Sequence, residues 1–125
     1  MIAAVLLLAL AGGESRIHEF HLHRGMATVA ISPAKASATV VVFVSTICPI
    51  SDKYVERLNG LYRDYSRRGV QFAAANPNAY ETWQHTESYA RENQLLYPLY
   101  RDEKNQLADR LGAQSTPEAF VFDSS

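Results

Sequence analysis

The 125-residue sequence predicts an α/β fold in which a central sheet is flanked by helices. Three runs rich in β-branched and aromatic residues, at 39–45, 70–75 and 118–122, are typical of buried strands. Apolar residues at helical spacing lie between the first two runs, and shorter helical segments lie between the second and the third. Strands that alternate with helices in this way pack as the layers of an α/β domain.

A β-hairpin is predicted ahead of the first buried strand. Residues 16–23 alternate in polarity, residues 27–31 form a second short run, and Gly25 supplies the turn between them. The residues at 32–38 are typical of a loop, and the buried strand at 39–45 follows it.

Helices are predicted between the buried strands. The first covers 51–68, and Gly69 ends it. A polar helix over 81–92 follows the break at 76–78, and a shorter helix covers 104–111. A short strand, interrupted by a proline, is expected at 96–100. The apolar residues at helical spacing in the first helix are Val55, Leu58, Tyr62 and Tyr65, and the aromatic residues expected to pack over the sheet are Tyr80, Trp83 and Tyr89.

The composition indicates a single domain and argues against nucleic-acid binding. A chain of this length buries most of its apolar surface without a metal or a disulfide. The net charge of −1 comes from interspersed acidic and basic residues, so the sequence lacks the basic stripe that binds nucleic acid. Cys48 is the only cysteine, and a redox role therefore needs a thiol from another molecule. We expect no cofactor.

The N-terminal segment is similar to the core of a signal peptide. Residues 2–11 are apolar without interruption, and Ala9-Leu10-Ala11 is a small-residue motif typical of a cleavage site. The segment is too short to span a bilayer, because a helix needs about 20 residues for that. We therefore predict a signal peptide over 1–13, a domain over 16–125, and export to the periplasm or the extracellular space. If the segment is instead a strand or a plain tail, the protein is cytoplasmic.

Cys48 lies where the buried strand at 39–45 gives way to a helix. Pro49 suits the first helical turn, where its missing N–H costs no hydrogen bond. At a helix N-terminus, unpaired N–H groups and the helix dipole stabilise a thiolate and lower the cysteine pKa from its usual ~8.5. This placement predicts a reactive thiol, and the alternative is a buried, inert cysteine.

Four segments between residues 39 and 123 carry a family resemblance: Val42-Phe43-Val44-Ser45 with Cys48-Pro49-Ile50-Ser51, Arg68-Gly69-Val70-Gln71-Phe72, Tyr97-Pro98-Leu99-Tyr100-Arg101-Asp102, and residues 112–123. With a cysteine after the first central strand and Thr116-Pro117 before a later one, the chain resembles the thioredoxin fold. Within that superfamily it is most similar to the redoxin group, the alkyl hydroperoxide reductase and thiol-specific antioxidant (AhpC/TSA) relatives of thioredoxin. The resemblance implies a mixed sheet flanked by helices, with the N-terminal hairpin ahead of it. Because the sequence stops directly after a strand, which would leave an open sheet edge, we expect the domain at 16–125 to be C-terminally incomplete, with a further strand and helix missing.

The same resemblance assigns the residues of the groove. Cys48 is the attacking thiolate, and Pro117 is a cis-proline that faces it. The backbone of Thr116 pairs with an extended peptide or disulfide substrate. We therefore predict Thr116, Pro117 and Pro49 as substrate-binding residues.

Ser45 and Ser51 are predicted as catalytic residues beside Cys48. Peroxiredoxins carry the motif Pro-x-x-x-Thr/Ser-x-x-Cys, in which the hydroxyl positions peroxide; Ser45 matches the hydroxyl, whereas Val41 stands at the proline. Ser51 stands where thioredoxins carry their second cysteine, so an external thiol must release a mixed disulfide. An arginine completes the peroxidase pocket, but Arg101 and Arg110 are expected on the solvated surface.

The resulting hypothesis is a thiol oxidoreductase or thiol peroxidase of the antioxidant type. Its single nucleophilic cysteine attacks a disulfide or a hydroperoxide, and an external thiol or thiol protein is the reductant. One alternative is a catalytically inactive binding module of the same fold. Another is a copper-handling domain in which His21 and His23, on one face of the hairpin strand, would act with Cys48. We expect ordinary strand histidines and no metal site.

Overall fold

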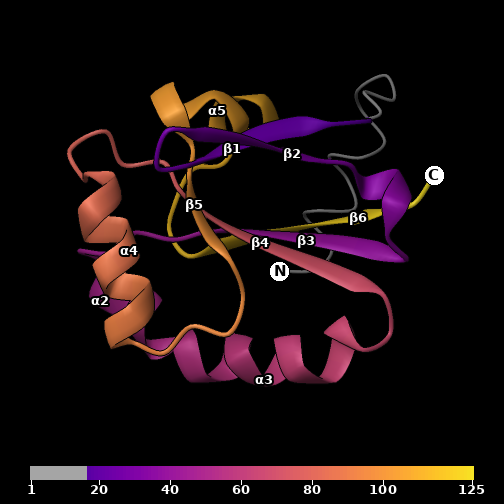
Figure 1. The fold of residues 1–125 in the computed structure, drawn as a ribbon, viewed down its shortest axis with the longest axis horizontal. Coiled ribbons are helices and arrows are strands. Elements are labelled where there is room, and N and C mark those ends of the chain that lie inside the picture. The colour runs from indigo at the N-terminus through magenta and orange to yellow at the C-terminus, as the bar shows by residue number, and fades with distance from the viewer. Residues whose placement is uncertain (1–16) are drawn as a thin grey trace.

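The computed structural model describes residues 17–125 as a six-stranded sheet with helices on both faces (Figure 1). The spatial order of the strands is β2-β1-β5-β4-β3-β6. The strands are β1 (Phe20–Arg24), β2 (Ala27–Ile31), β3 (Ala38–Phe43), β4 (Val70–Asn76), β5 (Leu99–Arg101) and β6 (Glu118–Asp123). The helices are η1 (Pro33–Lys35), α2 (Pro49–Lys53), α3 (Val55–Ser66), α4 (Trp83–Glu92), η2 (Glu103–Asn105) and α5 (Gln106–Leu111).

The sheet is mixed, which confirms the predicted thioredoxin-like α/β fold. Strand β4 runs parallel to both of its neighbours, β3 and β5. Strand β6 pairs antiparallel with β3, and the hairpin β1-β2 joins the sheet through an antiparallel contact between β1 and β5. Helix α5 covers one face, and α3 and α4 cover the other (Figure 1).

Strand β3 lies between β4 and β6 in the sheet and is packed on both faces. Val41 and Phe43 point into the core beneath α5, and Val42 and Val44 point into the core beneath α3 and α4. A strand covered on both faces has apolar residues at consecutive positions, which explains the uninterrupted run in the sequence. The chain leaves this buried strand at the point where Cys48 follows.

The segment after β3 differs from its prediction in two places. The strand ends at Phe43, not at residue 45, because the N–H of Ser45 turns away from the sheet to donate to Ser51 Oγ at 3.4 Å. The predicted helix over 51–68 is two helices, since Tyr54 has φ −96° and ψ −5° and separates α2 from α3. The start of α2 at Pro49 agrees with the expected place of this proline in the first helical turn, whereas the break at Tyr54 was not predicted.

The polar helix also begins later than predicted. Helix α4 begins at Trp83, because Thr82 Oγ1 accepts the N–H of His85 at 3.2 Å and caps it. Glu81 thus lies outside the helix and is buried. The prediction that Tyr80 packs over the sheet is wrong, since this side chain is 94% exposed.

The prediction that Arg101 lies on the solvated surface is wrong, because only 16% of its side chain is exposed. It lies at the end of β5, where Nη2 donates to the carbonyl oxygen of Asn78 at 3.5 Å. Arg110 is exposed, as expected. The predicted signal peptide at 1–13 lies outside the described residues. Within 17–125, no helix has the length and apolar character needed to cross a membrane.

Candidate functional site

Cys48 occupies the N-cap of α2, directly ahead of Pro49 at the first helical position. Its backbone is extended, with φ −95° and ψ 112°, and its N–H donates to the carbonyl oxygen of Ser45 at 3.3 Å. The side chain is half-buried. The turn after β3 therefore presents the sulfur to solvent at the start of a helix, where N–H groups lack partners.

Hydrogen bonds around the sulfur lower the pKa of Cys48 below its usual value. The backbone N–H of Ser51 has the largest effect, followed by the side chain of Thr116, and both stabilise the negative sulfur. Partial burial of the thiol opposes them, while the Ser51 hydroxyl and the N–H of Ile50 add to them. In the neutral form the thiol instead donates to the carbonyl oxygen of Thr116, 3.6 Å from Sγ.

Thr116 and Pro117 lie opposite the sulfur, although they are far from Cys48 in the sequence. The peptide bond between them is cis, and both residues are half-buried at the start of β6. They line a groove of about 430 Å³, whose remaining walls are largely apolar. Pro49 is exposed and does not line this groove. The groove residues are Val42, Ile50, Tyr54, Leu58, Ser115, Thr116, Pro117, Glu118 and Ala119.

Ser51 is enclosed behind the thiol. Its side chain is 2% exposed, and its Oγ accepts the N–H of Ser45 at 3.4 Å. The residue thus contacts both ends of the turn that carries Cys48. It takes the place of a second cysteine while contributing to the low thiol pKa.

The Ser45 hydroxyl is hydrogen-bonded to a buried carboxylate. Its hydroxyl donates to Glu81 Oε2 at 2.9 Å, and Oγ also accepts the N–H of Ile47 at 3.3 Å. Because a hydroxyl has one proton, Ser45 has none left to donate to a peroxide or to the thiolate in this arrangement. Val41, at the proline position of the peroxiredoxin motif, is fully buried in the core.

Glu81 is the part of the site that the sequence analysis missed. It was placed within a polar helix, where a glutamate is ordinarily solvated. No local pattern in the sequence distinguishes a buried glutamate from an exposed one, because its partners at Ser45 and Thr46 are 36 and 35 residues away along the chain.

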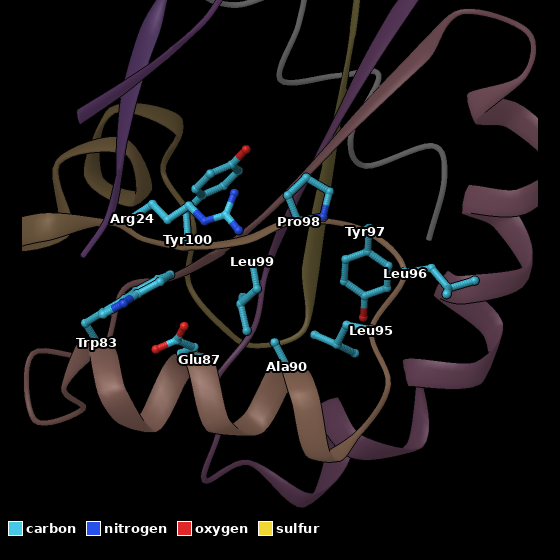
Figure 2. A pocket seen from close by; sticks show the side chains of 10 residues that line it. All are labelled: Arg24, Trp83, Glu87, Ala90, Leu95, Leu96, Tyr97, Pro98, Leu99 and Tyr100. Atoms are coloured by element: carbon cyan, nitrogen blue, oxygen red, sulfur yellow. The ribbon is translucent and has the colours of Figure 1, made fainter. Parts of the chain in front are cut away.

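A second hollow lies between α4, β5 and the end of β1 (Figure 2). Its volume is about 320 Å³, and it contains none of the predicted site residues. Trp83 and Glu87 border it from α4, Arg24 from the hairpin, and Tyr100 from β5 (Figure 2).

The hairpin histidines do not form a metal site with Cys48 in the described part of the chain. Residues His21 and His23 share a face of β1, and His21 is exposed. Across residues 17–125, no group of three His, Cys, Asp or Glu side chains is arranged to hold a metal ion.

Comparison with known proteins places the chain in a family. The model of the AhpC/TSA family matches residues 14–125. No curated protein matches the chain.

Among solved structures, two uncharacterised proteins have a TM-score of 0.76 with this chain. A hypothetical protein from Sinorhizobium meliloti 1021 is 26% identical, and the match covers 85% of this chain and 62% of that protein. An uncharacterised conserved protein from Geobacillus kaustophilus is 28% identical, with 85% and 60% covered. The chain thus spans less than two thirds of the length of either protein.

A third structure is a putative thiol:disulfide interchange protein DsbE from Chlorobium tepidum, with a TM-score of 0.74. It is 20% identical, and the match covers 85% of this chain and 74% of that protein. At this identity the similarity shows the fold alone.

Proposed function

The chain belongs to the AhpC/TSA family, and from this premise we propose that it is a thiol-dependent oxidoreductase with Cys48 as its nucleophile. The observation that carries the proposal is the position of the sulfur, at the N-cap of α2 and opposite Thr116. The N–H of Ser51 lowers the pKa of Cys48, so a larger fraction of the thiol is ionised near neutral pH.

The reaction with a disulfide takes two exchange steps. The Cys48 thiolate attacks one sulfur of the substrate, forms a mixed disulfide with it and expels the other sulfur as a thiolate. An external thiolate then attacks the substrate sulfur of the mixed disulfide, forms a new disulfide and releases the Cys48 thiolate. The second step needs an external thiol because Ser51 occupies the position of a resolving cysteine.

A hydroperoxide is the other substrate class for the same nucleophile. The thiolate would attack the terminal peroxide oxygen to give a sulfenic acid, while the O–O bond breaks and the alkoxide takes up a proton. The position of Ser45 favours a disulfide instead. Its proton is donated to Glu81, so the hydroxyl that would position a peroxide is already committed.

The experiment that tests the proposal is the pH dependence of Cys48 alkylation by iodoacetamide. We expect a midpoint well below the ~8.5 of an ordinary thiol. The same chain in denaturant is the matched control, because it contains the same single thiol without the folded environment.

A midpoint equal to that of the denatured chain, or no reaction without denaturant, would overturn the proposal. It would favour the binding module, an alternative that the buried Ser51 in place of a second cysteine supports. Addition of peroxide or of a disulfide substrate, followed by mass spectrometry, separates a sulfenic acid from a mixed disulfide.

We also propose that the domain at 16–125 is exported and that the apolar segment at 2–11 is the signal-peptide core. N-terminal sequencing of the mature protein tests this proposal. Cleavage near residue 13 is expected, and an intact N-terminus on a cytoplasmic protein would contradict it.

A further inference from the structure

Glu81 is a buried carboxylate that faces the turn ahead of Cys48. Its side chain is 3% exposed, and among residues 17–125 it has no ion-pair partner. A buried carboxylate is costly unless hydrogen bonds satisfy it.

Both carboxylate oxygens of Glu81 accept hydrogen bonds from the Cys48 turn. Oε2 accepts the hydroxyl of Ser45, and Oε1 accepts the backbone N–H of Thr46, each at 2.9 Å. The Ser45 hydroxyl in turn accepts the N–H of Ile47 at 3.3 Å. One side chain therefore determines, directly or through Ser45, the direction of the two peptide N–H groups that precede Cys48.

The loop that carries Glu81 is itself fixed to the core. Asn76 and Thr86 are both fully buried, and Asn76 Nδ2 donates to Thr86 Oγ1 at 3.4 Å. Asn76 Oδ1 accepts the N–H of Asn78 at 3.0 Å, and the Asn78 carbonyl accepts the N–H of Glu81 at 3.2 Å. These hydrogen bonds hold the backbone of Glu81 without any contribution from the Cys48 turn.

The Thr46 N–H requires an acceptor, and the Ser45 hydroxyl donates its proton to the other carboxylate oxygen. A carboxylate supplies only acceptors and therefore matches both donors. A glutamine of the same shape would accept the Thr46 N–H with its oxygen but would direct its amide N–H at Ser45 Oγ, so the Ser45 proton would lose its acceptor. The site therefore uses the chemistry of the carboxylate as well as its size.

We propose that Glu81 is the positioning residue of Cys48, fixing the Ser45–Ile47 turn so that the sulfur lies at the N-cap of α2 opposite Thr116. The inference rests on the proposed function of Cys48 and adds the residue that sets its geometry. The pKa of Cys48 depends on hydrogen bonds from Ser51, Thr116 and Ile50, and Glu81 is not among the groups that shift it directly. Glu81 therefore acts on the thiol through the turn.

The test compares Glu81→Gln with a chemically matched change elsewhere. Asp102 is also a buried carboxylate, 2% exposed, and it accepts two backbone N–H groups, those of Leu107 and Ala108, at 2.9 and 2.8 Å. Those groups belong to α5 and not to the Cys48 turn. Asp102→Asn therefore reproduces the loss of a buried carboxylate with two donors while leaving the turn intact.

We measure the pH profile of Cys48 alkylation for the unaltered protein and both variants, with circular dichroism as a check of folding. In Glu81→Gln we expect the midpoint to rise by about half a unit or more. The rate at a pH one unit below the midpoint of the unaltered protein should then fall about threefold, because less thiolate is present. In Asp102→Asn we expect the midpoint of the unaltered protein. Ser45→Ala, which keeps the carboxylate but removes its link to Ile47, should shift the midpoint in the same direction by less.

An unchanged midpoint in a folded Glu81→Gln variant would overturn the inference, as would an equal shift in Asp102→Asn. If Glu81→Gln does not fold, Ser45→Ala decides: a raised midpoint supports the inference, and an unchanged one overturns it. A different result would contradict the proposed function itself. In that case the alkylation midpoint of the unaltered protein would equal that of its denatured chain, regardless of the midpoints of the variants.

Discussion

Replacing Ser51 with cysteine should convert the single-thiol site into a dithiol site. Ser51 is 2% exposed, and both its N–H and its hydroxyl interact with the Cys48 sulfur. A sulfur placed at Oγ therefore lies beside the nucleophile. The substitution weakens one long hydrogen bond, from the N–H of Ser45 at 3.4 Å. We expect it to cost about 1 kcal/mol of stability, which leaves the protein folded.

The gain in activity follows from effective concentration. Under the proposed function, only an external thiol can release the mixed disulfide of the unaltered protein. In Ser51→Cys the second thiol is held in place, and even a short flexible tether gives an effective concentration of about 1 mM. With external thiol at about 0.01 mM, release of the mixed disulfide should therefore be about 100-fold faster.

Insulin reduction measures this gain, and thiol titration after mild oxidation counts free sulfhydryl groups. The matched control is Ser66→Cys, which adds a cysteine at the end of α3 farthest from α2 (Figure 1). A folded Ser51→Cys variant that keeps two free thiols, and reduces insulin no faster than Ser66→Cys, would refute the geometry described for the site.

Further predictions concern stability. Burial raises the pKa of Tyr97 to about 12, so its contribution to stability is complete below the ~10 of an unfolded tyrosine and is lost as the pH rises toward 12. Tyr97→Phe should raise the midpoint of alkaline unfolding measured by circular dichroism, and an unchanged midpoint would count against this cause. Gly60→Ala, in α3 with open space around the new methyl group, should stabilise the protein by about 0.5–1 kcal/mol in urea unfolding. Gly69→Ala should destabilise it by about 1 kcal/mol or more, because φ is +81° and the methyl group would lie 3.1 Å from Ser37 Oγ; shifts of the same sign would contradict this contrast.

Most of the sheet could be predicted because buried strands and their turns leave local signals. The strands at β3, β4 and β6 are continuous apolar or alternating runs, and Gly25 and Gly69 have the positive φ values that their turns require. The break at Tyr54 left no such signal. Apolar side chains recur through α3 at helical spacing, but the short α2 is defined by hydrogen bonds of the Cys48 turn.

Some features of the site could also be predicted from the sequence, and others could not. Cys48 followed by Pro49 predicted a thiol at a helix N-terminus, and α2 places it there. Thr116 and Pro117 were assigned through the family resemblance, because 68 residues separate Thr116 from the thiol that it contacts. Ser45 matched a motif in the sequence, but its hydroxyl faces Glu81. The sequence motif specified the residue type and not the direction of its hydrogen bond.

The sequence by itself determined the α/β class, the single cysteine and its place between strand and helix, since each depends on residues that are neighbours along the chain. Only the tertiary structure decided which groups surround the thiol. The Thr46 N–H and the Ser45 hydroxyl contact Glu81, and the sulfur contacts Thr116, only when β3 lies between β4 and β6 in the sheet. A hydrogen bond between distant segments depends on that packing, and no local pattern encodes it.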